Sequence, residues 1–178
     1  MVEITLPIIL QILQTAGILV GIVYYITIMR NSQRAQELQL ETRQAQLFMN
    51  IYNQFIQKGF SEDWIQVTFQ NDWESLDDYW EKYGVLTNPK GLAQIISILA
   101  FFEGIGVLLK RKLIAISMVD DLMSSYVLQT WNKYGPTLEE ARERLNRPEL
   151  WEHVSYLYDE IQKAYKKQHG HDFPTTDP

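Results

Sequence analysis

The hydrophobic pattern of the chain begins with one long apolar run. Residues 6–29 contain no Lys, Arg, Asp, Glu or His, and more than half of them are Ile, Leu or Val. A helix of this length spans roughly 36 Å, which exceeds the ~30 Å of bilayer hydrocarbon. Residues 1–29 are therefore predicted to form a single transmembrane anchor. Residues 30–46, which lack Gly and Pro, are predicted to continue it as a polar helical stalk.

The charges that flank this run predict its orientation. Glu3 precedes the run, whereas Arg30 and Arg34 follow it directly. Because basic residues favour the inner side of a membrane, we expect residues 30–178 to lie in the cytoplasm and the N-terminus outside. A cleaved signal peptide fits less well, since no basic residue precedes the run and no small-residue cleavage site follows it. The expected location is thus the cell membrane, with a single pass.

One face of the predicted membrane helix carries small and polar side chains. Gln14, Gly17 and Gly21 lie at positions i, i+3 and i+7 and therefore share a face. The spacing of the two glycines lets two helix backbones approach closely, and the Gln14 amide can hydrogen-bond across such a contact. Alternatively, the glycines are incidental, because glycine is common in membrane helices. The pattern indicates a candidate self-association face.

The rest of the chain shows helical periodicity, and period-2 alternation is not sustained anywhere. Stop signals occur at Gly59, Gly84 and Gly135, the last followed by Pro136. Start signals occur at a series of candidate caps and at one proline: Ser61, Asp72, Asn88, Ser117, Thr137 and Pro148. We therefore predict an all-α fold of about five to seven helices, with a compact bundle over residues 47–168 and a disordered tail over residues 169–178.

Residues 89–110 form a second strongly apolar segment. It is interrupted by Gln94 and Glu103 and flanked by basic residues. The segment has the length of a membrane span, but these polar interruptions favour the central helix of a soluble bundle.

Several short motifs in this region resemble an uncharacterised family. They are Phe101–Gly106, Lys110–Leu113, Val119–Leu122, Trp131 and Arg142–Arg144. Together they resemble prokaryotic families of small, single-pass, membrane-anchored proteins with a helical cytoplasmic domain, which are named only as domains of unknown function. The resemblance covers roughly residues 92–160. It implies the layout described above and supplies no activity.

Composition and motifs disfavour an enzyme. The 178 residues include no cysteine, which excludes thiolate zinc sites and cysteine nucleophiles. The net charge of -6 argues against a nucleic-acid partner. Nucleophile-elbow, Walker A and dinucleotide motifs are missing. Glu149 and His153 share a helix face but supply only two ligands, and we interpret His169 and His171 as solvated, so no metal or cofactor is expected.

Glu103 is the only acid in the apolar segment 89–110. Burying a carboxylate without compensation is costly, so the side chain must find a partner. We interpret it as a structural buried acid that ties two helices together, with Arg142, Arg144 and Arg147 as candidate partners. The alternative is a catalytic acid of a hydrolase that uses the same arginines.

Basic residues gather in two clusters. One consists of Lys110, Arg111 and Lys112, and the other of Arg142, Arg144 and Arg147. Both are expected to be solvated or ion-paired, and contact with anionic phospholipid is the alternative interpretation.

These observations favour an interaction or scaffold protein that works from the membrane without catalysis. We expect it to act as a homo-oligomer or as an accessory subunit of a partner membrane protein, because confinement in the bilayer raises local concentration. A membrane-tethered sensor or effector of stress or phage defence is the alternative, and the hydrolase built on Glu103 is the third hypothesis.

Overall fold

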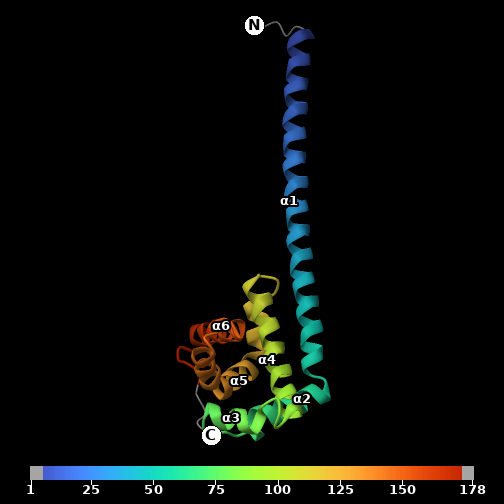
Figure 1. Cartoon of the computed structure of the whole chain (residues 1–178). Coiled ribbons are helices and arrows are strands. Elements are labelled where there is room, and N and C mark those ends of the chain that lie inside the picture. The colour runs from blue at the N-terminus through green and yellow to red at the C-terminus, as the bar shows by residue number, and fades with distance from the viewer. Residues whose placement is uncertain (1–5, 174–178) are drawn as a thin grey trace. The chain divides into compact units, whose positions relative to one another are not determined.

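The computed structural model describes residues 6–173, and all regular structure in this part of the chain is helical. Six α-helices and one π-helical segment follow one another (Figure 1). They are α1 (Leu6–Phe55), α2 (Lys58–Ile65), η1 (Gln66–Gln70), α3 (Leu76–Tyr83), α4 (Pro89–Lys110), α5 (Ile116–Leu145) and α6 (Glu152–His169). The predicted all-α fold, with a long apolar N-terminal helix and a helical bundle after it, is confirmed. Residues 1–5 and 174–178, which include Glu3 and half of the predicted tail, lie outside the described residues.

The chain divides into two compact units, with the boundary between Arg43 and Gln44. The described part of the first unit is helix α1 alone, and all of its residues from Leu6 to Arg43 are exposed. The helix continues without a break through residues 30–46, as expected from a stretch of good helix formers without Gly or Pro. The last part of α1 belongs to the second unit, where Phe48 and Phe55 are buried.

The second unit is a helical bundle built around α4. Helix α6 packs against both α4 and α5. Helix α4 contributes several fully buried side chains to the shared core: Ile95, Ile98, Phe102 and Ile105. Both α1 and α4 are long and apolar enough to cross a membrane, but the apolar window is 39% buried in α4 and not buried at all in α1. Helix α4 is therefore the central bundle helix that the sequence predicts.

Aromatic packing explains where α1 ends. The Phe55 ring contacts those of Phe60 and Tyr126, with centroids 5.6 and 4.6 Å apart. This packing turns the chain after Phe55, so α1 stops four residues before the predicted stop at Gly59, which lies inside α2. The sequence predicts Ser61 as the cap of the next helix, but Ser61 does not cap α2. Its hydroxyl instead donates to the carbonyl of Phe55 and satisfies the end of α1.

The largest difference from the sequence prediction is in α5. The predicted stop at Gly135–Pro136 is wrong, because α5 continues through both residues to Leu145. Pro136 cannot donate a backbone hydrogen bond, but Tyr134 and Leu138 on either side of it are buried and hold the helix together. Because α5 begins at Ile116 and runs on to Leu145, both Ser117 and Thr137 lie inside the helix, and neither is a cap.

The remaining helix ends divide between confirmed and corrected predictions. Asn88 caps α4 by accepting a hydrogen bond from the Gly91 N–H at 2.9 Å, and Gly84 ends α3, both as predicted. Ser75 replaces the predicted Asp72 as the cap of α3. Helix α6 begins at Glu152, four residues after Pro148. After α6 the chain turns back, and the Phe173 ring packs on Tyr165 with centroids 5.2 Å apart.

Helix α4 ends in a Schellman motif with a lysine at its left-handed position. The N–H of Lys112 donates to the carbonyl of Leu109, and that of Leu113 donates to the carbonyl of Leu108, each at 2.9 Å. Lys112 has a φ of 57°, in the region that favours glycine. The left-handed conformation costs a residue with a Cβ atom about 1 kcal/mol or more.

Candidate functional site

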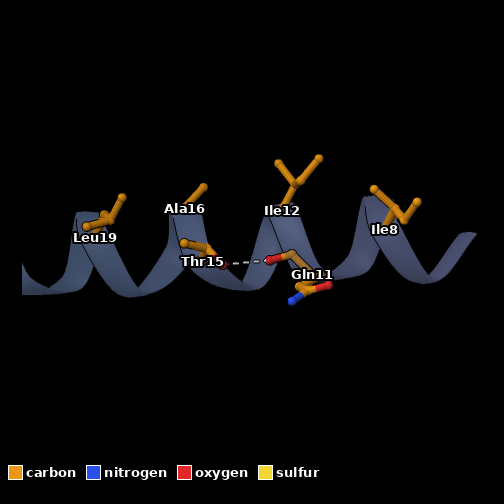
Figure 2. Close-up of a pocket in the computed structure, with 6 residues that line it drawn as sticks. All are labelled: Ile8, Gln11, Ile12, Thr15, Ala16 and Leu19. Carbon is orange, nitrogen blue, oxygen red and sulfur yellow. Dashed lines mark hydrogen bonds between the residues drawn. The ribbon is translucent and has the colours of Figure 1, made fainter. Parts of the chain in front are cut away.

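The apolar part of α1 presents large aliphatic side chains to its surroundings. Figure 2 shows Ile8, Ile12 and Leu19 projecting from the helix, while the hydroxyl of Thr15 donates to the carbonyl of Gln11 at 2.8 Å. This hydrogen bond satisfies the Thr15 hydroxyl within the helix, so it does not require water. The surface is thus chemically suited to contact with lipid or with another apolar helix.

The residues of the predicted association face all lie on this exposed helix. Gln14, Gly17 and Gly21 are exposed. No atom lies within 4 Å of where a Cβ would stand on either glycine. The face is therefore open along the backbone, which is the condition for close approach of a second helix.

Glu103 finds partners other than those predicted. Its Oε1 lies 2.8 Å from Nδ1 of His153, and its Oε2 accepts the backbone N–H of Val154 at 2.8 Å. Both side chains are half-buried, with about a fifth of their surface exposed (23% for Glu103 and 21% for His153). A hydrogen bond to the N–H of Val154 satisfies a free donor in the first turn of α6, where a negative charge is also favoured by the helix dipole. Glu103 therefore ties α4 to α6, and no arginine takes part.

The first basic cluster lies at the end of α4 and in the loop after it. The ammonium group of Lys110 lies 3.8 Å from a carboxylate oxygen of Glu152, and both side chains are about half exposed. Arg111 and Lys112 are exposed, and within residues 6–173 no carboxylate lies within 4 Å of either cation. The loop is tied to α1 by Gln44, whose side-chain amide donates to the carbonyl of Lys112 at 3.0 Å.

The second basic cluster is engaged within the bundle. The guanidinium of Arg142 donates to the carbonyls of Leu150 and Trp151, at 2.7 and 3.0 Å. The Trp151 backbone is left-handed, with φ of 55°, so these bonds hold a strained turn before α6.

The other two arginines of this cluster form ion pairs. Arg144 pairs with Asp77 and Glu140, and its hydrogen bond to Asp77 raises the pKa of the guanidinium above its ordinary value. Arg147 pairs with Glu149 at 2.8 Å. The two basic clusters therefore differ: the arginines are occupied by the protein, whereas Arg111 and Lys112 are directed to solvent.

One set of buried polar contacts was missed by the sequence analysis. The indole Nε1 of Trp64 donates to the hydroxyl of Thr130 at 2.9 Å, and that of Trp73 donates to Thr137 at 2.8 Å. Between them, the Tyr134 hydroxyl donates to the carbonyl of Val67 at 2.9 Å. The spacing of Thr130, Tyr134 and Thr137 at i, i+4 and i+7 was the only available signal, and it resembles any other helix face.

Within residues 6–173, no group of three His, Cys, Asp or Glu side chains converges on a point where a metal ion could bind. Glu149 and His153 do not share a helix face as predicted, because Glu149 lies before α6. Glu149 is paired with Arg147, and His153 is bonded to Glu103.

Comparison with known proteins places the chain in a family. The family model described as "Domain of unknown function (DUF4760)" matches residues 11–161. This range includes Glu103, both basic clusters and the candidate association face. It confirms the resemblance to a family of unknown function and extends it well beyond residues 92–160. No curated protein and no solved structure matches the chain.

Proposed function

We propose that this chain, which belongs to the DUF4760 family of domains of unknown function, is a single-pass membrane protein that displays a helical interaction domain in the cytoplasm. The exposed apolar surface of α1 carries the proposal. Leu6, Val20 and Val23 are each 65–71% exposed, and none of the apolar window of this helix is buried within the protein. Exposed apolar surface is unfavourable in water by about 25 cal/mol per Å², and insertion into lipid removes that cost.

The proposed orientation rests on the basic residues that follow the apolar run. Arg30 and Arg34 are exposed on α1, directly after the span, and the anionic inner leaflet attracts such charges. This orientation supports a cytoplasmic second unit that is attached to the membrane by α1.

Protein interaction is the activity that this arrangement supports best. Anchoring confines copies of the chain to two dimensions and raises their local concentration, so even a weak contact becomes populated. The open face at Gln14, Gly17 and Gly21 offers such a contact between spans. In the second unit, Glu103 is engaged at both carboxylate oxygens and Arg142 at backbone carbonyls, which supports structural roles for both residues.

Crosslinking of the full chain in its native membranes tests self-association. We expect discrete oligomers from the wild type and fewer from the double variant Gly17→Leu, Gly21→Leu, because the added side chains separate the backbones. Ala16→Leu is the control, since it places a bulky side chain in the same part of the helix but away from the association face. A monomer in the wild type, or equal loss in both variants, would contradict a contact through this face.

Membrane insertion and orientation need a separate test. Alkaline carbonate should leave the full chain in the membrane pellet, and protease should reach a C-terminal tag only after the cell membrane is opened. Release into the supernatant would disprove the anchor. Digestion of the tag in intact cells would show that the C-terminus lies outside the cell, opposite to the proposed orientation.

A further inference from the structure

We propose that the loop Lys110–Leu113, called the basic loop below, binds the anionic phospholipid headgroups of the membrane surface. In this proposal Arg111 and Lys112 contact phosphate groups, and Leu113 enters the boundary between headgroups and acyl chains. The inference rests on the proposed membrane anchoring, and it adds a second lipid contact to α1.

The charge of the basic loop is the first observation. The chain as a whole carries a net charge of -6, but three consecutive cations stand here. Within residues 6–173, the carboxylate that lies within 4 Å of these cations is that of Glu152, 3.8 Å from Lys110. Arg111 and Lys112 have no carboxylate within 4 Å in the described residues, unlike Arg144 and Arg147, which are both paired. Two exposed cations are therefore available to an anionic partner.

The backbone of Lys112 is the second observation. Its φ of 57° falls where a glycine is favoured, at the position of a Schellman motif that glycine usually occupies. A lysine here keeps a cation at the expense of local stability. Strain that persists at a surface position points to a role for the side chain that causes it.

The basic loop is also held in one conformation. Besides the two hydrogen bonds of the Schellman motif, the carbonyl of Lys112 accepts the side-chain amide of Gln44. The next residue, Ile114, is 2% exposed and anchors the loop in the core. A loop fixed at both ends loses little conformational entropy when it binds a surface.

Leu113 distinguishes a lipid surface from an acidic protein as the partner. It is 45% exposed and directly follows the three cations. Cations with an adjacent apolar side chain are the combination that peripheral membrane contacts use, since charge attracts the anionic surface and the apolar group inserts. An acidic protein would explain the cations without using Leu113.

The position of the basic loop in the second unit agrees with this partner. The loop lies at the opposite end of the unit from α2 and α3 (Figure 1). It contacts Gln44, the first residue of the unit, and is therefore at the end where α1 enters. Residues 30–43 connect the apolar run to this end, and as a helix they span about 20 Å. Contact thus requires the unit to lie close to the bilayer, which can be measured directly.

The test uses the full chain in lipid nanodiscs of two compositions, phosphatidylcholine alone and phosphatidylcholine mixed with phosphatidylserine. Because the chain has no cysteine, Ser117→Cys supplies a single labelling site for a fluorophore, exposed and close to the basic loop. Spin-labelled lipid quenches the fluorophore when the loop approaches the bilayer. We expect quenching to be several-fold stronger with phosphatidylserine and to weaken as salt is added.

Two charge-reversal variants distinguish an effect of the basic loop itself from an effect of the net charge of the protein. Arg111→Glu with Lys112→Glu should abolish the dependence on phosphatidylserine. Lys58→Glu with Lys90→Glu makes the same change in net charge at exposed sites in α2 and at the start of α4, and should leave the dependence intact. Leu113→Ser should weaken quenching in the mixed discs. Equal quenching in both lipids, as expected if the partner were an acidic protein, overturns the proposal.

Lys112→Gly provides a readout that a structural role would not give. Glycine relieves the left-handed backbone, so the melting temperature should rise while the phosphatidylserine dependence falls. A rise in melting temperature with unchanged lipid dependence would mean that Lys112 does not contact lipid. Nanodisc assembly distinguishes failure of the proposed membrane anchor from failure of the proposed lipid contact of the basic loop. A chain that does not enter the discs would contradict both proposals. A chain that enters them but shows no dependence of quenching on phosphatidylserine would contradict only the lipid contact.

Discussion

Gly106 of α4 lies directly against the backbone carbonyl of His153, where any Cβ atom would overlap it. The absence of a side chain at this point lets α4 and α6 approach closely, and the contact stands next to the hydrogen bonds of Glu103 with His153 and Val154. Close backbone approach and the carboxylate thus act on the same helix crossing.

The first prediction concerns this crossing. Gly106→Ala should lower the free energy of unfolding by about 1–3 kcal/mol, because a methyl group forces the helices apart. Gly104→Ala is the control: Gly104 is on the same helix, but no atom lies within 4 Å of its Cβ position. There alanine should be neutral or stabilise by up to about 1 kcal/mol, through helix propensity. Urea denaturation of the full chain in detergent measures both, and equal effects would contradict the close contact.

The second prediction concerns the structural role of Glu103. Glu103→Ala removes the acceptor for the Val154 N–H and the partner of His153, and should cost about 1–3 kcal/mol of stability. Glu103→Gln keeps one side-chain oxygen as an acceptor and should cost less. The same denaturation experiment measures the two variants. Unchanged stability in both variants would contradict the structural role of Glu103.

The sequence predicted that these segments are helical better than it predicted where each helix ends. Asn88 and Pro89 marked the start of α4 correctly because capping is a local interaction. Pro136 was misleading because α5 is held by buried side chains on both sides of the proline, and that burial comes from segments far away in the chain. Tertiary packing therefore overrode the local signal.

The partners of Glu103 show the same limit for the site. Its burial and need for a partner followed from its place among apolar residues, but charge alone pointed to arginines. In the structure its partners are instead the His153 side chain and the backbone N–H of Val154, which lie 50 and 51 residues away in the sequence. The left-handed Lys112 was equally hidden, since sequence signals for that conformation depend on glycine or asparagine.

The third prediction concerns the buried contact between Trp64 and Thr130. Thr130→Val leaves the Trp64 indole N–H without its acceptor in the core and should cost about 1–3 kcal/mol. Trp64→Phe removes the donor together with part of the ring. If the hydrogen bond joins the two residues, the double variant should be less destabilised than the sum of the single variants. Additive effects in this double-mutant cycle would rule out the coupling.

The fourth prediction concerns alkaline pH. Burial, with a smaller effect of nearby Tyr83, raises the pKa of Tyr79 to about 12 from its ordinary value of 10. The folded protein therefore keeps this proton at a pH where the unfolded chain loses it. Stability from Tyr79 is complete below pH 10 and is lost as pH rises from 10 to 12, at up to about 1.4 kcal/mol per pH unit.

Tyr79→Phe removes this titration and should therefore flatten the fall in stability above pH 10. Urea denaturation of wild type and variant from about pH 7 to about pH 11.5 measures it. The difference between them should be constant up to about pH 9, which serves as the internal control, and should then shift in favour of the variant. Tyr134, whose pKa burial also raises, is a poorer test because its hydroxyl donates to the carbonyl of Val67. Parallel stability curves for wild type and Tyr79→Phe across the alkaline range would show that Tyr79 titrates alike in the folded and unfolded chain.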